Sequence, residues 1–190
     1  MEKIILASGS PRRKEILQKN HVKFDIITSE VDENYPTGCS KEQIAMLLAL
    51  RKALDVETQH EDGIIIAADT IVYIDEILGK PTGLEEAIYM LEKLSGNTHE
   101  VITGVSVIRA KSFDRVAFYD STKVVFKELN EGKIRDYIAS GEVWDKAGAY
   151  AIQGKGVELI KKIEGDYYNV MGLPFEKLKL VLANRFNVKL

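Results

Sequence analysis

Residues 63–69 have the sequence Gly63-Ile64-Ile65-Ile66-Ala67-Ala68-Asp69, a continuous apolar run that ends in a carboxylate. An uninterrupted apolar run of this length is typical of a β-strand that other elements cover on both faces. Such a strand needs helices on each side of its sheet, and helical patterns do flank the run. We therefore predict an α/β or α+β fold in which Asp69 belongs to a strand that is covered on both faces.

The rest of the chain contains patterns for further helices and strands. Ser40 and Gln43 match a capping box, which predicts a helix from Ser40 to about Thr58, and Thr82 and Glu85 predict a second capping box. Other helices are predicted over 11–20, 83–94 and 131–140 and from 174 onward, and strands near 3–7, 24–27, 98–109, 115–127, 149–152 and 157–163. Because helix-linked strands alternate with a long hairpin, we expect a mixed sheet.

Length and composition limit the class of protein. A chain of 190 residues with 45% hydrophobic and 29% charged side chains fits one domain, which we place over 1–190. Its single cysteine, Cys39, excludes an internal disulfide and fits a reducing compartment. The net charge of -3 argues against a protein that coats nucleic acid, so any site for a polyanion must be a local cluster. No apolar run approaches the length of a membrane span.

A basic cluster lies where a predicted strand gives way to a helix, in Ser8-Gly9-Ser10-Pro11-Arg12-Arg13. Pro11 favours the first helical position. Arg12, Arg13 and Lys14 place positive charge where the helix dipole disfavours it, by about 0.3–1 kcal/mol each. An anion bound by helix amides and guanidinium groups would offset this penalty. A solvated basic helix start gives the same pattern.

Asp69 follows directly on the apolar run that predicts the first strand described above. A buried carboxylate is unfavourable unless it is paired or binds a metal, so Asp69 indicates a metal ligand, a general base or both. A structural, hydrogen-bonded aspartate is the alternative. An upstream loop contains Glu30, Asp32 and Glu33, whose oxygen atoms suit Mg²⁺ or Mn²⁺, although an acidic loop that is simply solvated has the same composition.

Three lysines stand near these features. Lys52 continues the row of apolar positions along its predicted helix, Lys80 lies between a glycine and a proline, and Lys146 precedes a stretch rich in glycine and alanine. Each could be a surface lysine whose stem covers apolar area. Their coincidence with glycines and with Asp69 favours a joint role.

The motifs of the chain, taken in order, form a recognisable set. They are Leu6-Ala7-Ser8-Gly9-Ser10-Pro11-Arg12-Arg13, Ala68-Asp69-Thr70, Gly79-Lys80-Pro81, Leu94-Ser95-Gly96, Thr103-Gly104-Val105, Asp145-Lys146-Ala147-Gly148-Ala149-Tyr150 with Gln153-Gly154, and Gly165-Asp166-Tyr167 with Gly172-Leu173-Pro174. In order and spacing they closely resemble the Maf family over essentially the whole chain. The resemblance implies a fold like that of the inosine triphosphate pyrophosphatases, with a long mixed sheet that makes a cleft between two lobes. It also implies a nucleoside triphosphate pyrophosphatase that cleaves between the α- and β-phosphates with a divalent metal.

The family branch that acts on dTTP and UTP is similar to this sequence at Arg12, Thr70 and Gln153. By the same matching, Asp69 falls on the proton acceptor of the family. From the resemblance we expect three catalytic residues, Asp69, Lys80 and Lys52, and two ligands for Mg²⁺ or Mn²⁺, Asp69 and Glu33. The expected substrate-binding residues are Ser8, Arg12, Arg13, Thr70, Lys146 and Gln153.

Some alternatives stay open at this point. The substrate could be a purine or modified nucleotide, or the protein could be a non-catalytic nucleotide-binding regulator of cell division, as the septum-formation name of the family suggests. We expect a cytoplasmic protein without nucleic-acid or membrane partners, and a homodimer is plausible. Ala67 and Ala151 replace glycines that many members carry, and Ala151 would be strained if its backbone needed a positive φ.

Overall fold

The computed structural model describes residues 2–190, and the chain divides into two compact units. Unit 1 contains the described residues up to 69 together with 103–120 and 172–190, and unit 2 contains 70–102 and 121–171. The strands β3 (Ile64–Ile74), β5 (Thr98–Arg109) and β6 (Arg115–Phe126) contribute residues to both units. Neither unit is therefore a single continuous stretch of chain.

The strands form one seven-stranded sheet with the order β2-β1-β3-β5-β6-β7, and β4 pairs with β3. The remaining strands are β1 (Ile4–Leu6), β2 (Asp25–Ile26), β4 (Glu76–Leu78) and β7 (Ile160–Glu164). β1 pairs in parallel with β2 and β3, whereas β3 with β4 and β6 with β7 are antiparallel pairs. The mixed sheet predicted from the sequence is confirmed.

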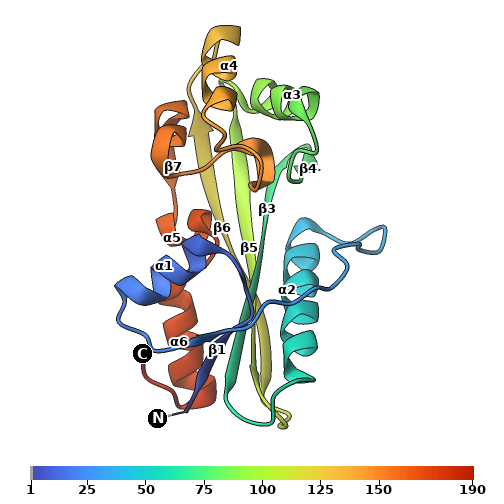
Figure 1. Ribbon diagram of the computed structural model, residues 1–190, viewed down its shortest axis with the longest axis vertical. Coiled ribbons are helices and arrows are strands. Elements are labelled where there is room, and N and C mark those ends of the chain that lie inside the picture. The colour runs from blue at the N-terminus through green and yellow to red at the C-terminus, as the bar shows by residue number, and fades with distance from the viewer. Residues whose placement is uncertain (1) are drawn as a thin grey trace. The chain divides into compact units, whose positions relative to one another are not determined.

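In unit 1, helices cover the sheet on both faces. Figure 1 shows α2 (Lys41–Glu57) on one side of the strands, and α1 (Pro11–Lys19) and α6 (Phe175–Phe186) on the other. One buried cluster joins alternate residues of β1 and β3, such as Ile65 and Ala67, to Ala53 of α2. The apolar run that begins β3 is buried along its whole length, as predicted.

Gly104 lets α2 lie directly against β5. A Cβ atom at this position would stand 2.2 Å from the carbonyl carbon of Ala45, so no other residue fits without moving the helix. The predicted capping box starts the same helix, because the Ser40 N–H donates to Gln43 Oε1 (2.9 Å) and the Gln43 N–H donates to Ser40 Oγ (3.3 Å). Identifiable residues thus determine both where α2 begins and how closely it packs on β5.

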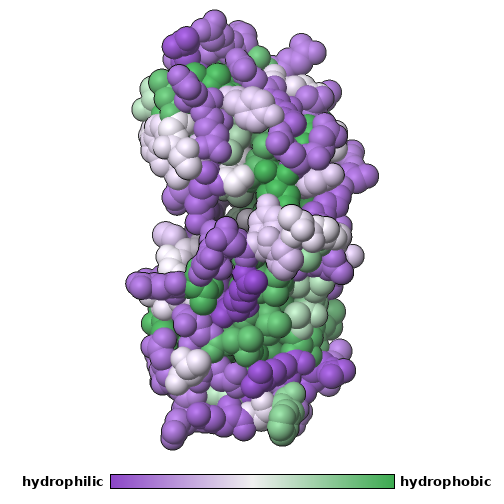
Figure 2. Space-filling model, turned by 90° about the vertical axis from the view of Figure 1, so that its right-hand side faces the viewer, coloured by the Kyte–Doolittle hydropathy of each residue, from purple (hydrophilic) through white to green (hydrophobic). Residues whose placement is uncertain are grey.

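The outer side of α2 is not strongly polar. Leu47 is half-buried, and so are Leu50 and Leu54, which pack against the cluster that contains Ala53. Figure 2 views the face on which α2 lies, and green apolar residues are mixed with purple hydrophilic ones on it. Among residues 2–190, no helix combines the length and the apolar character that crossing a bilayer requires.

Unit 2 has a core of its own. The helices α3 (Leu84–Leu94) and α4 (Glu131–Ala139) pack against each other, and buried residues of both join the cluster that contains Val72, Val124 and Phe126. The unit also holds two 3₁₀ helices, η1 (Ala147–Ala149) and η2 (Gly154–Leu159), and the short helix α5 (Tyr167–Met171). The helices predicted over 83–94 and 131–140 are confirmed.

Two local predictions in unit 2 are wrong. The residue before α3 is Gly83, without a side-chain cap, and the N–H and hydroxyl of Thr82 both donate to Glu86 rather than pairing with Glu85. The strand predicted near 149–152 is absent, because the chain turns there through positive φ angles at Gly148 (69°) and Ala149 (57°). The positive φ considered for Ala151 falls at Ala149 instead, so Ala151 is not strained in this way.

Candidate active site

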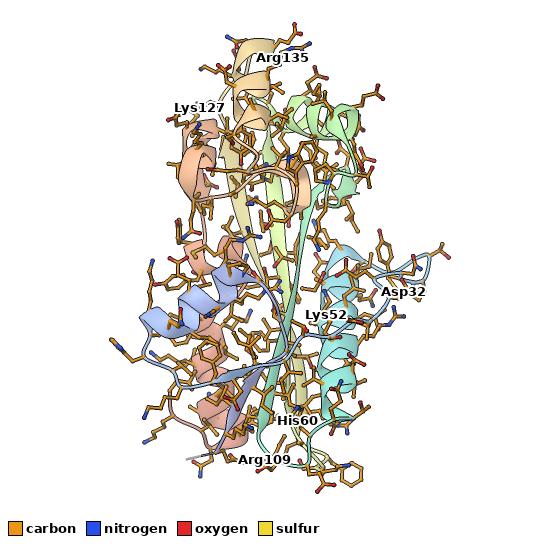
Figure 3. The ribbon with its side chains drawn as sticks, in the orientation of Figure 1. Asp32, Lys52, His60, Arg109, Lys127 and Arg135 are labelled. Carbon is orange, nitrogen blue, oxygen red and sulfur yellow. The ribbon has the colours of Figure 1, made fainter. Side chains whose placement is uncertain are left out.

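Lys52 joins two carboxylates in unit 1. Its ammonium group donates to Asp69 Oδ1 at 2.5 Å and to Glu33 Oε1 at 2.7 Å. The side chain of Lys52 is 14% exposed and that of Asp69 is 12% exposed, so this part of the arrangement is largely shielded from water. Figure 3 marks Lys52 on α2, and Asp32 in the loop beside that helix. The chain thus places a positive charge between two negative ones.

The position of Asp69 follows from strand geometry. Side chains alternate between the two faces of a strand, so Asp69 shares a face with Ile65 and Ala67. Those two residues belong to the cluster that contains Ala53 of α2, and Lys52 is the preceding residue of the same helix. The buried carboxylate predicted from the sequence is therefore confirmed, and its partner comes from the helix that packs on its face.

Arg13 connects the start of α1 to the segment that precedes α6. Its Nε donates to the carbonyl oxygen of Gly172 at 2.8 Å, and its Nη1 donates to Ser8 Oγ at 3.0 Å. Ser8 Oγ also accepts from the Ser10 N–H at 3.2 Å. Pro11 occupies the first turn of α1 as predicted, but Ser10 makes no side-chain cap. Ser8 and Arg13 are thus held together at the turn between β1 and α1.

The electrostatics of unit 1 link this turn to Asp69. Burial lowers the pKa of the Arg13 guanidinium, the carboxylate of Asp69 acts in the opposite direction, and the neighbouring charge of Arg12 lowers it further. Glu33 contributes as well, in the same direction as Asp69. A poorly hydrated guanidinium near other cations favours an anionic ligand, and phosphate oxygens match its fork of donors.

In unit 2, two lysine-bearing segments are adjacent. The Gly148 N–H donates to the carbonyl oxygen of Gly79 at 3.0 Å, which connects the turn before Lys80 to the turn after Lys146. A Cβ at Gly148 would lie 3.0 Å from Val72 Cγ1, so the second turn rests on β3. Lys80 is exposed, whereas the Lys146 side chain is 13% exposed and contacts Asp145.

Gln153 precedes η2 in a loop that several side chains hold. The Tyr150 hydroxyl lies 2.7 Å from His99 Nε2, and the Ala151 N–H donates to the Tyr137 hydroxyl at 3.0 Å. The sequence analysis missed His99 and Tyr137 as partners of this loop. The only indication in the sequence is the residue type, because buried tyrosine hydroxyls usually have a hydrogen-bond partner.

The predicted site residues therefore fall into two groups. Unit 1 brings together Ser8, Arg12, Arg13, Glu33, Lys52 and Asp69. Unit 2 contains Thr70, Lys80, Lys146 and Gln153. Asp69, which ends the first segment of unit 1, and Thr70, which begins unit 2, are consecutive in β3.

The donor set around Lys52 determines how a metal ion could be held. Among residues 2–190, no group of three or more His, Cys, Asp or Glu side chains is placed to hold an ion. Asp69 and Glu33 provide two carboxylates that already flank a cation, the Lys52 ammonium. Mg²⁺ is commonly bound through one or two carboxylates together with substrate phosphates. The residues therefore fit an ion that binds together with a triphosphate.

Comparison with known proteins places the chain among its relatives. Residues 3–185 match the family described as Maf-like protein. A Bacillus cereus protein named dTTP/UTP pyrophosphatase is 52% identical over 179 residues, which are 94% of this chain and 93% of that protein. A Bacillus anthracis protein of the same name is 51% identical over 189 residues, covering 99% of this chain and 97% of the other.

A solved structure supports the fold. The structure of a HAM1 protein from Coxiella burnetii aligns with a TM-score of 0.55 and 16% identity, over 96% of this chain and 99% of that one. At this identity the likeness concerns the fold alone, and it agrees with the expected long mixed sheet flanked by helices. Because the family match and the 52% identical relative each cover more than nine-tenths of the sequence, the chain belongs to the Maf family.

Proposed function

We propose that this protein is a nucleoside triphosphate pyrophosphatase that hydrolyses dTTP and UTP to the monophosphate and pyrophosphate with the help of a divalent metal. The observation that carries the proposal is the Lys52 ammonium between Asp69 and Glu33, two carboxylates that also act electrostatically on Arg13. The names of the relatives supply the substrates. A carboxylate can orient the attacking water, and ammonium and guanidinium groups can stabilise the charge that develops on the phosphates.

In the proposed reaction, a water molecule attacks the α-phosphorus and the bond from that phosphorus to the oxygen bridging to the β-phosphate breaks. Asp69 orients the water and accepts its proton. Lys52 holds the Asp69 carboxylate in place and, with Lys80, offsets the negative charge that develops on the leaving pyrophosphate. Ser8, Arg12 and Arg13 bind the phosphates at the start of α1.

Asp69 and Glu33 are the residues that would hold Mg²⁺ or Mn²⁺. A bound divalent ion supplies charge neutralisation for the phosphate oxygens and lowers the repulsion that a nucleophile meets. The support for this assignment is the donor set, because both groups are hard oxygen ligands that meet at one cation.

The proposed roles in unit 2 concern recognition of the substrate. Thr70 and Gln153 would hydrogen-bond the edge of the pyrimidine, and Lys146 would contact the substrate as well. Polar groups that are left unpaired by the wrong base strongly disfavour it, which suits discrimination between nucleotides. The support is the resemblance of these positions in the sequence to the motifs of the family, together with the substrate names of the relatives.

Release of pyrophosphate from dTTP and UTP under Mg²⁺ or Mn²⁺ tests the proposal. Asp69→Asn keeps the shape of the side chain but removes the proton acceptor, and we expect activity to fall by about 10²–10⁴-fold. Asp62→Asn is the matched control, because Asp62 is an exposed residue in the turn just before β3. Equal activity of wild type and Asp69→Asn would contradict the proposed role.

A panel of triphosphates under the same metal separates the alternatives. Faster hydrolysis of a purine nucleotide would contradict the pyrimidine assignment and leave the chemistry in place. Binding without turnover under every divalent metal would favour a regulatory protein. The proposal also places the protein in the cytoplasm, where nucleotide pools are found, and light scattering of the purified protein would measure whether it is a homodimer.

A further inference from the structure

The loop that carries Glu33 has little support from regular structure. Residues 27–36, between β2 and α2, lie in neither helix nor strand. An open groove of about 620 Å³ is lined by Val31, Tyr35 and Pro36 on the loop, by Leu54 on α2 and by Thr58 directly after the helix. Individual side-chain contacts at this groove therefore help to determine where Glu33 lies.

Arg51 makes one of those contacts. Its Nη1 donates to the carbonyl oxygen of Asn34. Asn34 is in turn held by Asp32, because its N–H donates to Asp32 Oδ1 at 2.9 Å and its Nδ2 donates to Oδ2 at 2.7 Å. The bonds from Asn34, aided by the charge of Arg51, hold the pKa of Asp32 below its ordinary value. Glu33 sits inside this closed turn.

The next residue of α2 completes the attachment. Lys52 donates to the Glu33 carboxylate at 2.7 Å. Consecutive residues of a helix point about 100° apart, so Arg51 and Lys52 reach the loop from different directions. Arg51 holds the backbone of the turn, and Lys52 holds the side chain that the turn presents.

We infer that Arg51 is a positioning residue, which fixes the Asp32–Asn34 turn so that the Glu33 carboxylate reaches Lys52 and Asp69. This inference rests on the proposed function for the part that Glu33 plays in metal binding. Arg51 itself needs no contact with substrate or metal. Residues that orient ligands in this way typically change metal affinity or activity by about 10–100-fold when they are replaced.

Hydrogen–deuterium exchange without nucleotide tests the attachment directly. Arg51→Met keeps the length of the side chain and removes the donor, so we expect faster exchange than in the wild type across residues 30–37. In Arg51→Lys, the exchange rate should lie between those of the wild type and Arg51→Met. Arg115→Met is the matched control, because Arg115 also contacts α2, through Glu57 at 3.0 Å, but lies away from this turn. Unchanged exchange in Arg51→Met would overturn the inference.

Metal dependence tests the consequence. In Arg51→Met we expect the Mg²⁺ concentration for half-maximal pyrophosphate release to rise about tenfold, and kcat at saturating Mg²⁺ to stay within about twofold of wild type. Binding of Mn²⁺ in the presence of a non-hydrolysable dTTP analogue, measured by electron paramagnetic resonance, should weaken to the same extent. A loosened loop with an unchanged metal requirement would also overturn the inference.

A double-mutant cycle with Glu33→Gln shows whether Arg51 acts through Glu33. In the Glu33→Gln background, Arg51→Met should raise the metal requirement no further. A second, equal rise would overturn the inference, since Arg51 would then act by another route. Absence of turnover in the wild type would contradict the proposed function alone, and the exchange comparison would still decide whether Arg51 holds the loop.

Discussion

Lys52 is the side chain on which the arrangement of carboxylates depends. Its ammonium lies within hydrogen-bonding distance of both Asp69 and Glu33, which without it would face each other as like charges. We expect Lys52→Met to lower pyrophosphate release by about 10²–10³-fold, and Lys52→Arg to restore part of it, because charge returns without the same reach. Lys41→Met, at the start of the same helix, is the control and should leave turnover close to wild type.

His99 should make the stability of the protein depend on pH. Burial lowers the pKa of its imidazole from the ordinary 6.5 to about 4. Between these values the unfolded chain binds the proton and the folded chain does not, so the free energy of unfolding falls as the pH drops from about 6.5 to 4. The shift corresponds to about 3 kcal/mol.

Urea unfolding of wild type and His99→Gln between pH 7.5 and 4.5 measures this effect. The loss of stability on acidification should be smaller in His99→Gln, because glutamine does not titrate. Parallel curves for the two proteins would show that His99 does not contribute. The carboxylates titrate in both proteins, so their contribution to the pH dependence is the same and drops out of the difference.

Single residues differ in how well their burial and contacts can be predicted from their neighbours in the sequence. The burial of Asp69 could be predicted from the apolar run before it, and the inward position of Lys52 from the helical row that it continues. The contacts of Arg51 and His99 could not, because their partners lie 17 and 51 positions away. Only the packing of α2 and of the 147–153 turn brings those partners near.

At the scale of elements, the placement of α2 depends on Gly104. A methyl group there would overlap the backbone at Ala45, so Gly104→Ala must push the helix away from β5. Overpacking of this kind usually destabilises by about 1–3 kcal/mol. Since α2 carries Lys52, we expect activity to fall together with the midpoint of urea unfolding. Gly83→Ala is the control, because nothing lies within 4 Å of its added methyl group.

Elements were predictable where their determinants are local. The Ser40–Gln43 capping box needs four consecutive residues and is confirmed. The box at Thr82 failed because Glu86, one position further on, competes for the same donors. The turn at 147–149 escaped prediction since it is fixed by a hydrogen bond from Gly148 to Gly79, far away in the sequence.

For the whole molecule, we expect the Lys52 ammonium to make folding independent of metal. It is a cationic partner for both carboxylates, so removing divalent ions does not leave Asp69 and Glu33 facing each other without an opposite charge. We expect EDTA to abolish pyrophosphate release and to leave the thermal midpoint, followed by circular dichroism, unchanged. A fall of several degrees in EDTA would show instead that a metal stabilises the fold.

The class of fold was accessible from the sequence, and the family resemblance implied two lobes, but the position of the boundary between the units was not accessible. Apolar runs and capping boxes indicate strands and helices, and the family motifs imply a long mixed sheet. The unit boundary between Asp69 and Thr70 falls inside β3, where no proline, glycine or change of composition marks it. Tertiary contacts therefore group the distant segments into units, and local residue patterns do not reveal these contacts.

The bond from Arg13 to Gly172 has a consequence for how the protein is made. Lys52, Asp69 and Glu33 all lie within the first 69 residues of the sequence and leave the ribosome before residue 172. Arg13 reaches its carbonyl partner only after residue 172 has been synthesised, and α6 follows that residue. A chain cut off before this point would lack the carbonyl that anchors Arg13, so the turn between β1 and α1 is completed by a residue translated much later than the turn itself.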